Sequence, residues 1–295
     1  MPVMAASIQA MIGRMKYPLT LTLMLAATTV LHAVDSGRLL AFAADNRLTL
    51  ALGKFEPGHG WVQSVGFYAP PQSDDVFTLY TPAGKVAAVT IQEKRSPYRD
   101  GTFASWSAEV SAWDNRSTPY ALAVAGSAPL VDGALEPISA DNPEYKAIVS
   151  KYLKSRGLHV DQPFLTQAFA IPQVNQGQDE AVLIAHSDAG AVSTEHEASV
   201  YAVALLRWND HGKEKVLPLA SQTSFKPAGR TREEHEHLYG TRDYLRLIAA
   251  VDIDGDGWKE IILYDAKDNA TQLDVFTFNG RRLWRVLSAY KPNYN

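Results

Sequence analysis

Four carboxylates recur at regular spacing in one short stretch near the C-terminus. Counted from its first acidic residue, positions 1, 3, 5 and 9 are Asp252, Asp254, Asp256 and Glu260. Calcium takes roughly six to eight hard oxygen ligands at about 2.3–2.6 Å, and alternating acidic residues on a curled loop converge on one point. Gly257 at position 6 permits a sharp turn, after which the backbone carbonyl of Trp258 can face inward. The spacing predicts a calcium site, whereas the alternative is an acidic turn without an ion.

The same loop excludes an EF-hand and a dockerin loop. An EF-hand needs a glutamate at position 12, and here that position is Leu263. An EF-hand also needs a helix on each side. The flanking stretches 245–251 and 261–264 are instead short and apolar, as buried strands are.

An internal match at a spacing of 80 residues places this loop in a repeat. Residues 164–171 align with 244–251, and, without a gap, Glu180 then meets Glu260. Each unit is predicted to form a strand, a loop, a second strand, an excursion and a hairpin. Repetition of one small β unit is typical of propeller blades. Two units are too few for a closed propeller of about four or more blades, unless the N-terminal region supplies the others.

The loop and its flanking strands resemble the FG-GAP/VCBS-type calcium-binding repeat, known from integrin α-chain propellers and many secreted bacterial proteins. The loop carries the resemblance, and the repeat extends it to 160–295. The resemblance implies these calcium ligands: Asp252, Asp254, Asp256, the carbonyl of Trp258, and Glu260.

Two departures from the family pattern change what the resemblance predicts. The Gly-Ala-Pro ending of the integrin repeat is missing, because Ile261 to Asp265 follows the loop. In the first unit, Pro172, Val174 and Gln176 occupy the positions of the three aspartates. The first unit is therefore expected to keep the loop scaffold without its ion.

The elements that position these residues are mostly strands, so the expected fold class is mainly β. Stretches rich in β-branched and aromatic residues, separated by Pro/Gly turns, predict an N-terminal antiparallel β domain over 45–138, either sandwich-like or part of a barrel. A linking helix is expected over 141–157, since Asn142 can cap it, Pro143 suits its first turn and Gly157 ends it. A C-terminal β-repeat region, resembling propeller blades, is expected to follow.

The N-terminus is predicted to be a secretory signal over 1–33. This stretch contains Arg14 and Lys16 but no acidic residue. Its apolar run of 13 residues is shorter than the roughly 20 residues of a membrane-spanning helix. Cleavage is expected after Ala33 or Ala43, and the alternative is a membrane anchor left uncut. The mature protein is then expected to be periplasmic or secreted, without a stable membrane span.

Composition narrows the classes of function. The net charge of -4 gives no basic excess, on which nucleic-acid binding depends, so nucleic acid is not an expected partner. The absence of cysteine excludes disulfides, thiol catalysis and thiolate metal sites.

Two clusters that contain histidine give no catalytic motif. The adjacent His186, Ser187 and Asp188 cannot form the spatial relay of a serine triad. His235 and His237 are compatible with a zinc pair or a polar loop, and no third ligand is evident nearby in the sequence.

The sequence therefore predicts an exported, calcium-binding, non-enzymatic β protein that acts as a binding or scaffold module, with a protein or a glycan as its partner. The alternative from another class is a secreted hydrolase, directed at glycans, that has a structural calcium site. A glycosidase needs two carboxyl groups about 5–10 Å apart in a cleft, and spacing in the sequence does not show such a pair.

Overall fold

The computed structural model describes residues 37–44, 47–63, 76–95, 107–111, 113, 119–126, 134–172, 180–187, 200–224, 244–267 and 270–292. The chain divides into two units, Met1–Gly37 and Arg38–Asn295, and every strand and helix named below belongs to the second. The predicted signal over 1–33 lies outside the described residues.

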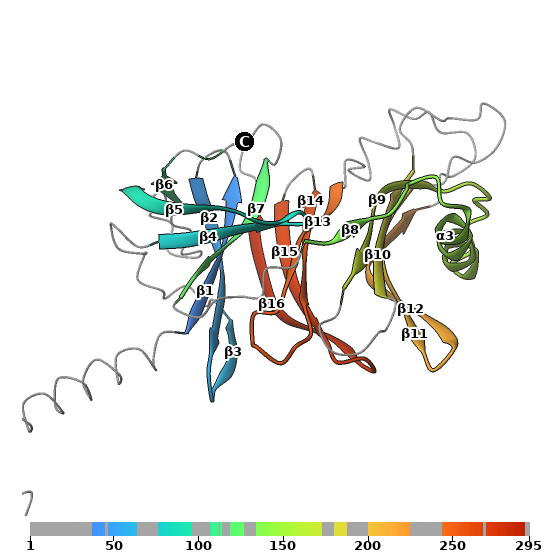
Figure 1. Cartoon of the computed structure of the whole chain (residues 1–295). Helices are drawn as coiled ribbons and strands as arrows, with labels where there is room; N and C mark the ends of the chain where they lie inside the picture. The colour runs from blue at the N-terminus through green and yellow to red at the C-terminus, as the bar shows by residue number, and fades with distance from the viewer. Residues whose placement is uncertain are drawn as a thin grey trace, which may run out of the picture. The chain divides into compact units, whose positions relative to one another are not determined.

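The N-terminal half contains one antiparallel sheet of seven strands, called here the N-terminal sheet (Figure 1). Its strands are β1 (Arg38–Ala44), β2 (Arg47–Glu56), β3 (Gly60–Gln63), β4 (Val76–Thr81), β5 (Gly84–Arg95), β6 (Ser107–Val110) and β7 (Tyr120–Ala125). Six of them pair in a ring, β1–β7–β4–β5–β6–β2 and back to β1, while β3 is added to β2. Alternating alanines of β1 and β7, such as Ala41 and Ala123, are buried against Phe77 and Leu79, which keeps the inside of this ring small.

This sheet begins earlier in the chain than the sequence indicates. The N-terminal domain was expected from residue 45, whereas β1 starts at Arg38. Leu40 and Ala43 are 0% exposed, and β1 pairs with β7 on one side and β2 on the other. Ala43, one of the two expected cleavage positions, therefore lies inside the fold.

A helix, α3 (Pro143–Ser155), follows the short strand β8 (Glu136–Pro137), and its position confirms the helix predicted from the sequence. The side chain of Asn142 accepts hydrogen bonds from the backbone N–H groups of Glu144 and Tyr145, which otherwise lack helical partners. Its buried residues Ile148, Val149 and Leu153 pack against the sheet of the first repeat unit. Among the described residues, no helix has the length and apolar character that crossing a membrane requires.

Both repeat units are four-stranded antiparallel meanders. The first contains β9 (Phe164–Ile171), β10 (Glu180–His186), β11 (Val200–Asp210) and β12 (Lys213–Ser224), with β8 as a fifth strand beside β9. The second contains β13 (Tyr244–Val251), β14 (Glu260–Lys267), β15 (Ala270–Phe278) and β16 (Leu283–Pro292). We call them the first and second repeat sheets. Their strands, with those of the N-terminal sheet, confirm the mainly β class.

At the loop end of their first two strands, the two meanders share their register at the predicted spacing. Glu180 pairs with Ile171 in the first sheet, as Glu260 pairs with Val251 in the second. The hairpins after the third strands also match, because Asn209 and Asn279 each accept a bond from the backbone N–H three residues later, at 2.7 and 3.0 Å.

The second repeat sheet packs on both of its faces (Figure 1). One face shares a hydrophobic cluster with the N-terminal sheet, in which Ile262 and Val275 meet Phe42 and Leu122. The other face shares a cluster with the first repeat sheet. The outer face of the first repeat sheet is covered by α3. The acidic loop thus belongs to the middle layer of the packed sheets.

Candidate metal centre

The acidic loop, residues 252–259, connects β13 to β14 directly after their last pair, Val251 with Glu260. Two glycines let it curl, since Gly255 has a φ of 84° and Gly257 a φ of 90°, in the region that side chains disfavour. The turn at Gly257 was predicted from the sequence, and the turn at Gly255 was not.

Three of the predicted ligands come together at this loop. Carboxylate oxygens of Asp252, Asp254 and Glu260 all lie within 4.8 Å of one another. Asp252 is 6% exposed and Glu260 is 0% exposed, while Asp254 is half-buried. The loop therefore gathers three acidic groups, two of them buried, and such a set can hold a hard cation.

The loop backbone holds these side chains in place. Asp252 accepts bonds from the N–H groups of Gly255 at 2.7 Å and Gly257 at 3.1 Å. Asp254 accepts from the N–H of Asp256 at 3.1 Å. These Asx-type bonds curl the chain around the two aspartates, which holds both carboxylates in place before any ion arrives.

Glu260 has one satisfied and one unsatisfied oxygen. Its Oε2 accepts a bond from the N–H of Ile253 at 2.6 Å, whereas its buried Oε1 has no hydrogen-bond partner among the described residues. A buried polar atom left in this way costs about 1–3 kcal/mol. A cation bound at the acidic group would supply the missing partner, so the three carboxylates could hold a hard cation.

The electrostatics of the site agree with that fit. Burial, and then the nearby carboxylates of Asp256 and Asp252, raise the pKa of Asp254 to about 6. Burial, followed by the charge of Asp254, holds the pKa of Glu260 well above its usual range. The raised pKa values mean that the charged forms of Asp254 and Glu260 are disfavoured, and a cation beside them would favour those charged forms.

The other two predicted ligands are placed differently. Asp256 is exposed, lies outside the group of three and accepts a bond from the N–H of Trp258 at 2.8 Å. The ring of Trp258 stands edge-on to Phe278 at 5.7 Å. Trp258 thus anchors the loop to the core, and its predicted role as a ligand rests on its backbone carbonyl alone.

Several sequence candidates fall elsewhere. In the first unit, Pro172 follows β9 and is exposed, while Val174 and Gln176 lie outside the described residues, as do His235 and His237. The Nε2 of His186 lies 3.2 Å from the carbonyl oxygen of Leu245 in β13, so this nitrogen contacts the backbone of the second repeat sheet. Burial lowers the pKa of His186, so the neutral ring donates this bond.

Comparison with protein-family models, with curated proteins and with solved structures found no match to this chain.

Proposed function

We propose that this chain is an exported calcium-binding protein of FG-GAP/VCBS type, which acts as a non-enzymatic binding or scaffold module. The observation that carries the proposal is the acidic group of Asp252, Asp254 and Glu260, in which the buried Oε1 of Glu260 finds no hydrogen-bond partner within the described part of the chain. The resemblance adds the exposed Asp256 and the carbonyl of Trp258 as further ligands.

The position of the loop supports a structural role for the ion. Ile253, the second residue of the loop, is 0% exposed and belongs to the cluster shared with the N-terminal sheet. Trp258, near its other end, packs against the cluster shared with the first repeat sheet. An ion that fixes this loop would therefore stabilise both interfaces of the middle layer.

Calcium is favoured over magnesium on chemical grounds. Magnesium needs near-octahedral geometry and gives up its waters reluctantly, whereas calcium tolerates an irregular set of carboxylates and carbonyls. The candidate ligands come from one loop and one strand end, which is an irregular set. An exported protein also meets calcium more often than a protein in the cytoplasm does.

Isothermal titration calorimetry of the EDTA-treated, dialysed protein tests the proposal. We expect one saturable calcium site and weaker binding of magnesium. Glu260→Gln, which removes the buried charge at similar volume, should abolish the binding heat. A wild-type protein that binds neither ion in this titration would refute the metal assignment, and with it the proposed function.

A further inference from the structure

The hairpins that follow the third strand of each repeat unit lie side by side. In the first repeat sheet, residues 209–212 form the turn between β11 and β12, and in the second, residues 279–282 form the turn between β15 and β16. Trp208 and Phe278, which directly precede these turns, pack edge-on with their ring centres 5.0 Å apart. The contact between these rings therefore brings the two turns together at one place on the surface.

Two lysines of the first hairpin lie on the side of their sheet that meets the second repeat sheet. Lys213 pairs with Asp210 and Lys215 pairs with Trp208, and residues directly opposite each other in an antiparallel pair share a face. Trp208 belongs to the cluster between the two repeat sheets, so both lysines lie on that side. Glu214, between them in the sequence, points to the opposite face because side chains alternate along a strand.

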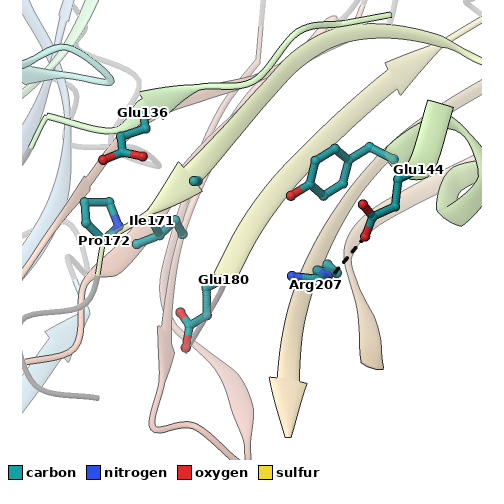
Figure 2. Close-up of a pocket in the computed structure, with 8 residues that line it drawn as sticks. Glu136, Glu144, Ile171, Pro172, Glu180 and Arg207 are labelled. Atoms are coloured by element: carbon teal, nitrogen blue, oxygen red, sulfur yellow. Dashed lines mark ion pairs between the residues drawn. The ribbon is translucent and has the colours of Figure 1, made fainter. Parts of the chain in front are cut away.

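The opposite face of this hairpin has its own ion pairs. Arg207 of β11 lies there, with its Nε 3.7 Å from Glu214 and its Nη2 3.7 Å from Glu144 of α3. Figure 2 shows the pair of Arg207 with Glu144 beneath the start of the helix. The carboxylates of Glu144 and Glu214 are therefore turned toward α3 and away from the two lysines.

The turn of the second hairpin adds two arginines. Arg281 and Arg282 are exposed, and their backbone N–H groups donate to the side chain of Asn279 at 3.3 and 3.0 Å, which holds the turn in shape. Within the described residues, neither these arginines nor the exposed Lys213 and Lys215 form an ion pair. We call Lys213, Lys215, Arg281 and Arg282 the basic patch.

Asp210 lies among these cations and shows that both hairpins contribute to one patch. Its hydrogen bond with His211, at 2.8 Å, and then the charges of Lys215 and Arg281 lower the pKa of Asp210. Asp210 offsets one of the four positive charges. The chain as a whole has a net charge of -4, so the patch differs in sign from the rest of the protein. Such a local excess of positive charge attracts an anionic partner.

The basic patch lacks the apolar side chains on which membrane and protein contacts depend. Of the exposed large hydrophobic residues in the described part of the chain, only Trp284 lies at the turn end of these hairpins. Trp284 pairs with Thr277, the neighbour of Phe278, and so lies on the other face of its sheet. A membrane-surface site inserts apolar residues, and a protein interface is centred on them. A glycan needs no such anchor.

We propose that the basic patch binds an acidic polysaccharide, a sugar chain that carries recurring sulfate, phosphate or carboxylate groups. The guanidinium groups of one hairpin bond these groups in a bidentate manner, while the ammonium groups of the other act as point charges. Two neighbouring pairs of cations match a ligand whose charges recur along its length. This inference names the partner of the proposed binding module and rests on that role, but not on the calcium ion.

Calorimetric titration of the full chain with dextran sulfate, and with uncharged dextran of the same length, tests this inference. We expect saturable binding of dextran sulfate and none of dextran. Arg281→Gln/Arg282→Gln should weaken that binding at least about fivefold at low salt, because two cations near an anionic ligand are lost. Lys213→Gln/Lys215→Gln should do the same. In both variants the affinity should fall less steeply with salt, since fewer counterions are released.

A matched control separates the basic patch from general charge attraction. Lys151→Gln/Lys154→Gln removes the same charge from the exposed side of α3 and should leave the affinity unchanged. The buffer contains calcium, because Trp258 packs on Phe278 and places the acidic loop beside the patch. A chain that binds calcium but not dextran sulfate loses this inference alone. Equal binding of dextran, equal weakening by the α3 variant, or binding of phosphatidylglycerol vesicles without dextran sulfate would each overturn it as well.

Discussion

Replacing Asp254 with asparagine removes one charge from the acidic group while preserving its shape. The amide oxygen of asparagine can still accept the bond from the N–H of Asp256 that Asp254 accepts at 3.1 Å. Asp254 is only half-buried, so the substitution leaves no cavity. The variant therefore tests the ion and the repulsion between carboxylates rather than the packing of the loop.

Two opposite effects on stability follow from this geometry. Calcium bound only to the folded wild type adds about 2.7 kcal/mol when its concentration is a hundred times Kd. For a chain of this size that is a rise in Tm of about 5–11 °C. In EDTA the variant should be at least as stable as the wild type, because burial and neighbouring carboxylates disfavour the ionised form of Asp254.

Differential scanning fluorimetry with calcium or EDTA measures both effects. We expect the wild type to show the calcium-dependent rise in Tm and Asp254→Asn to lose most of it. Asp274→Asn is the matched control, since Asp274 is a carboxylate of the same sheet whose partners are Gln272 and Arg285. A rise in Tm that persists in Asp254→Asn, or a wild type whose Tm ignores both additives, would refute the reasoning.

Three further predictions concern the rest of the fold. Because burial lowers the pKa of His186 in the fold, its contribution to stability is full above its ordinary value of 6.5 and is lost as the pH falls through the lower folded-state value. Denaturant titrations should therefore show His186→Gln losing less stability than the wild type from about pH 7 to about pH 5, and equal losses would contradict the argument. A Cβ at Gly53 would lie 2.6 Å from the carbonyl oxygen of Val62 and 2.8 Å from a carbon of Leu287. Gly53→Ala should cost about 2–4 kcal/mol in a urea titration, and a variant as stable as the wild type would show that the packing relaxes. Since β1 is a core strand, intact mass of the exported protein should place its first residue before Arg38. A start at Ala44 would contradict that expectation.

Local sequence rules predicted the features that depend on near neighbours in the chain. The cap at Asn142 and the stop near Gly157 framed α3, because capping and left-handed turns are set within a few residues. The offset of 80 residues predicted that β9 corresponds to β13 and β10 to β14, because similar patterns of apolar residues form similar strands. The acidic spacing also predicted that Asp252, Asp254 and Glu260 would meet.

Features that depend on distant contacts were not visible in the sequence. Residues 41–43 fit the end of a cleavage site as well as they fit a strand. Their pairing with β7, about 80 residues away in the sequence, makes them a strand. The burial of Lys259, at 3% exposure, and the unsatisfied Oε1 of Glu260 result from packing by other elements. The basic patch joins hairpins of both repeat sheets, which no single motif spans.

The packing of the layers also explains how two repeat units suffice without a closed propeller. In a propeller, each blade is covered by the next, whereas here α3 covers the outer face of the first repeat sheet and the N-terminal sheet covers that of the second. One glutamine side chain bonds the backbone of each edge strand of the second repeat sheet. Gln167 accepts from the N–H of Leu247 in β13, and Gln63 bonds both the N–H and the carbonyl of Ser288 in β16. Unpaired strand edges invite other chains, so these contacts protect the middle layer. The acidic loop connects the first two strands of that layer. An ion bound there would stabilise the contacts of Ile253 with the N-terminal sheet and of Trp258 with the first repeat sheet.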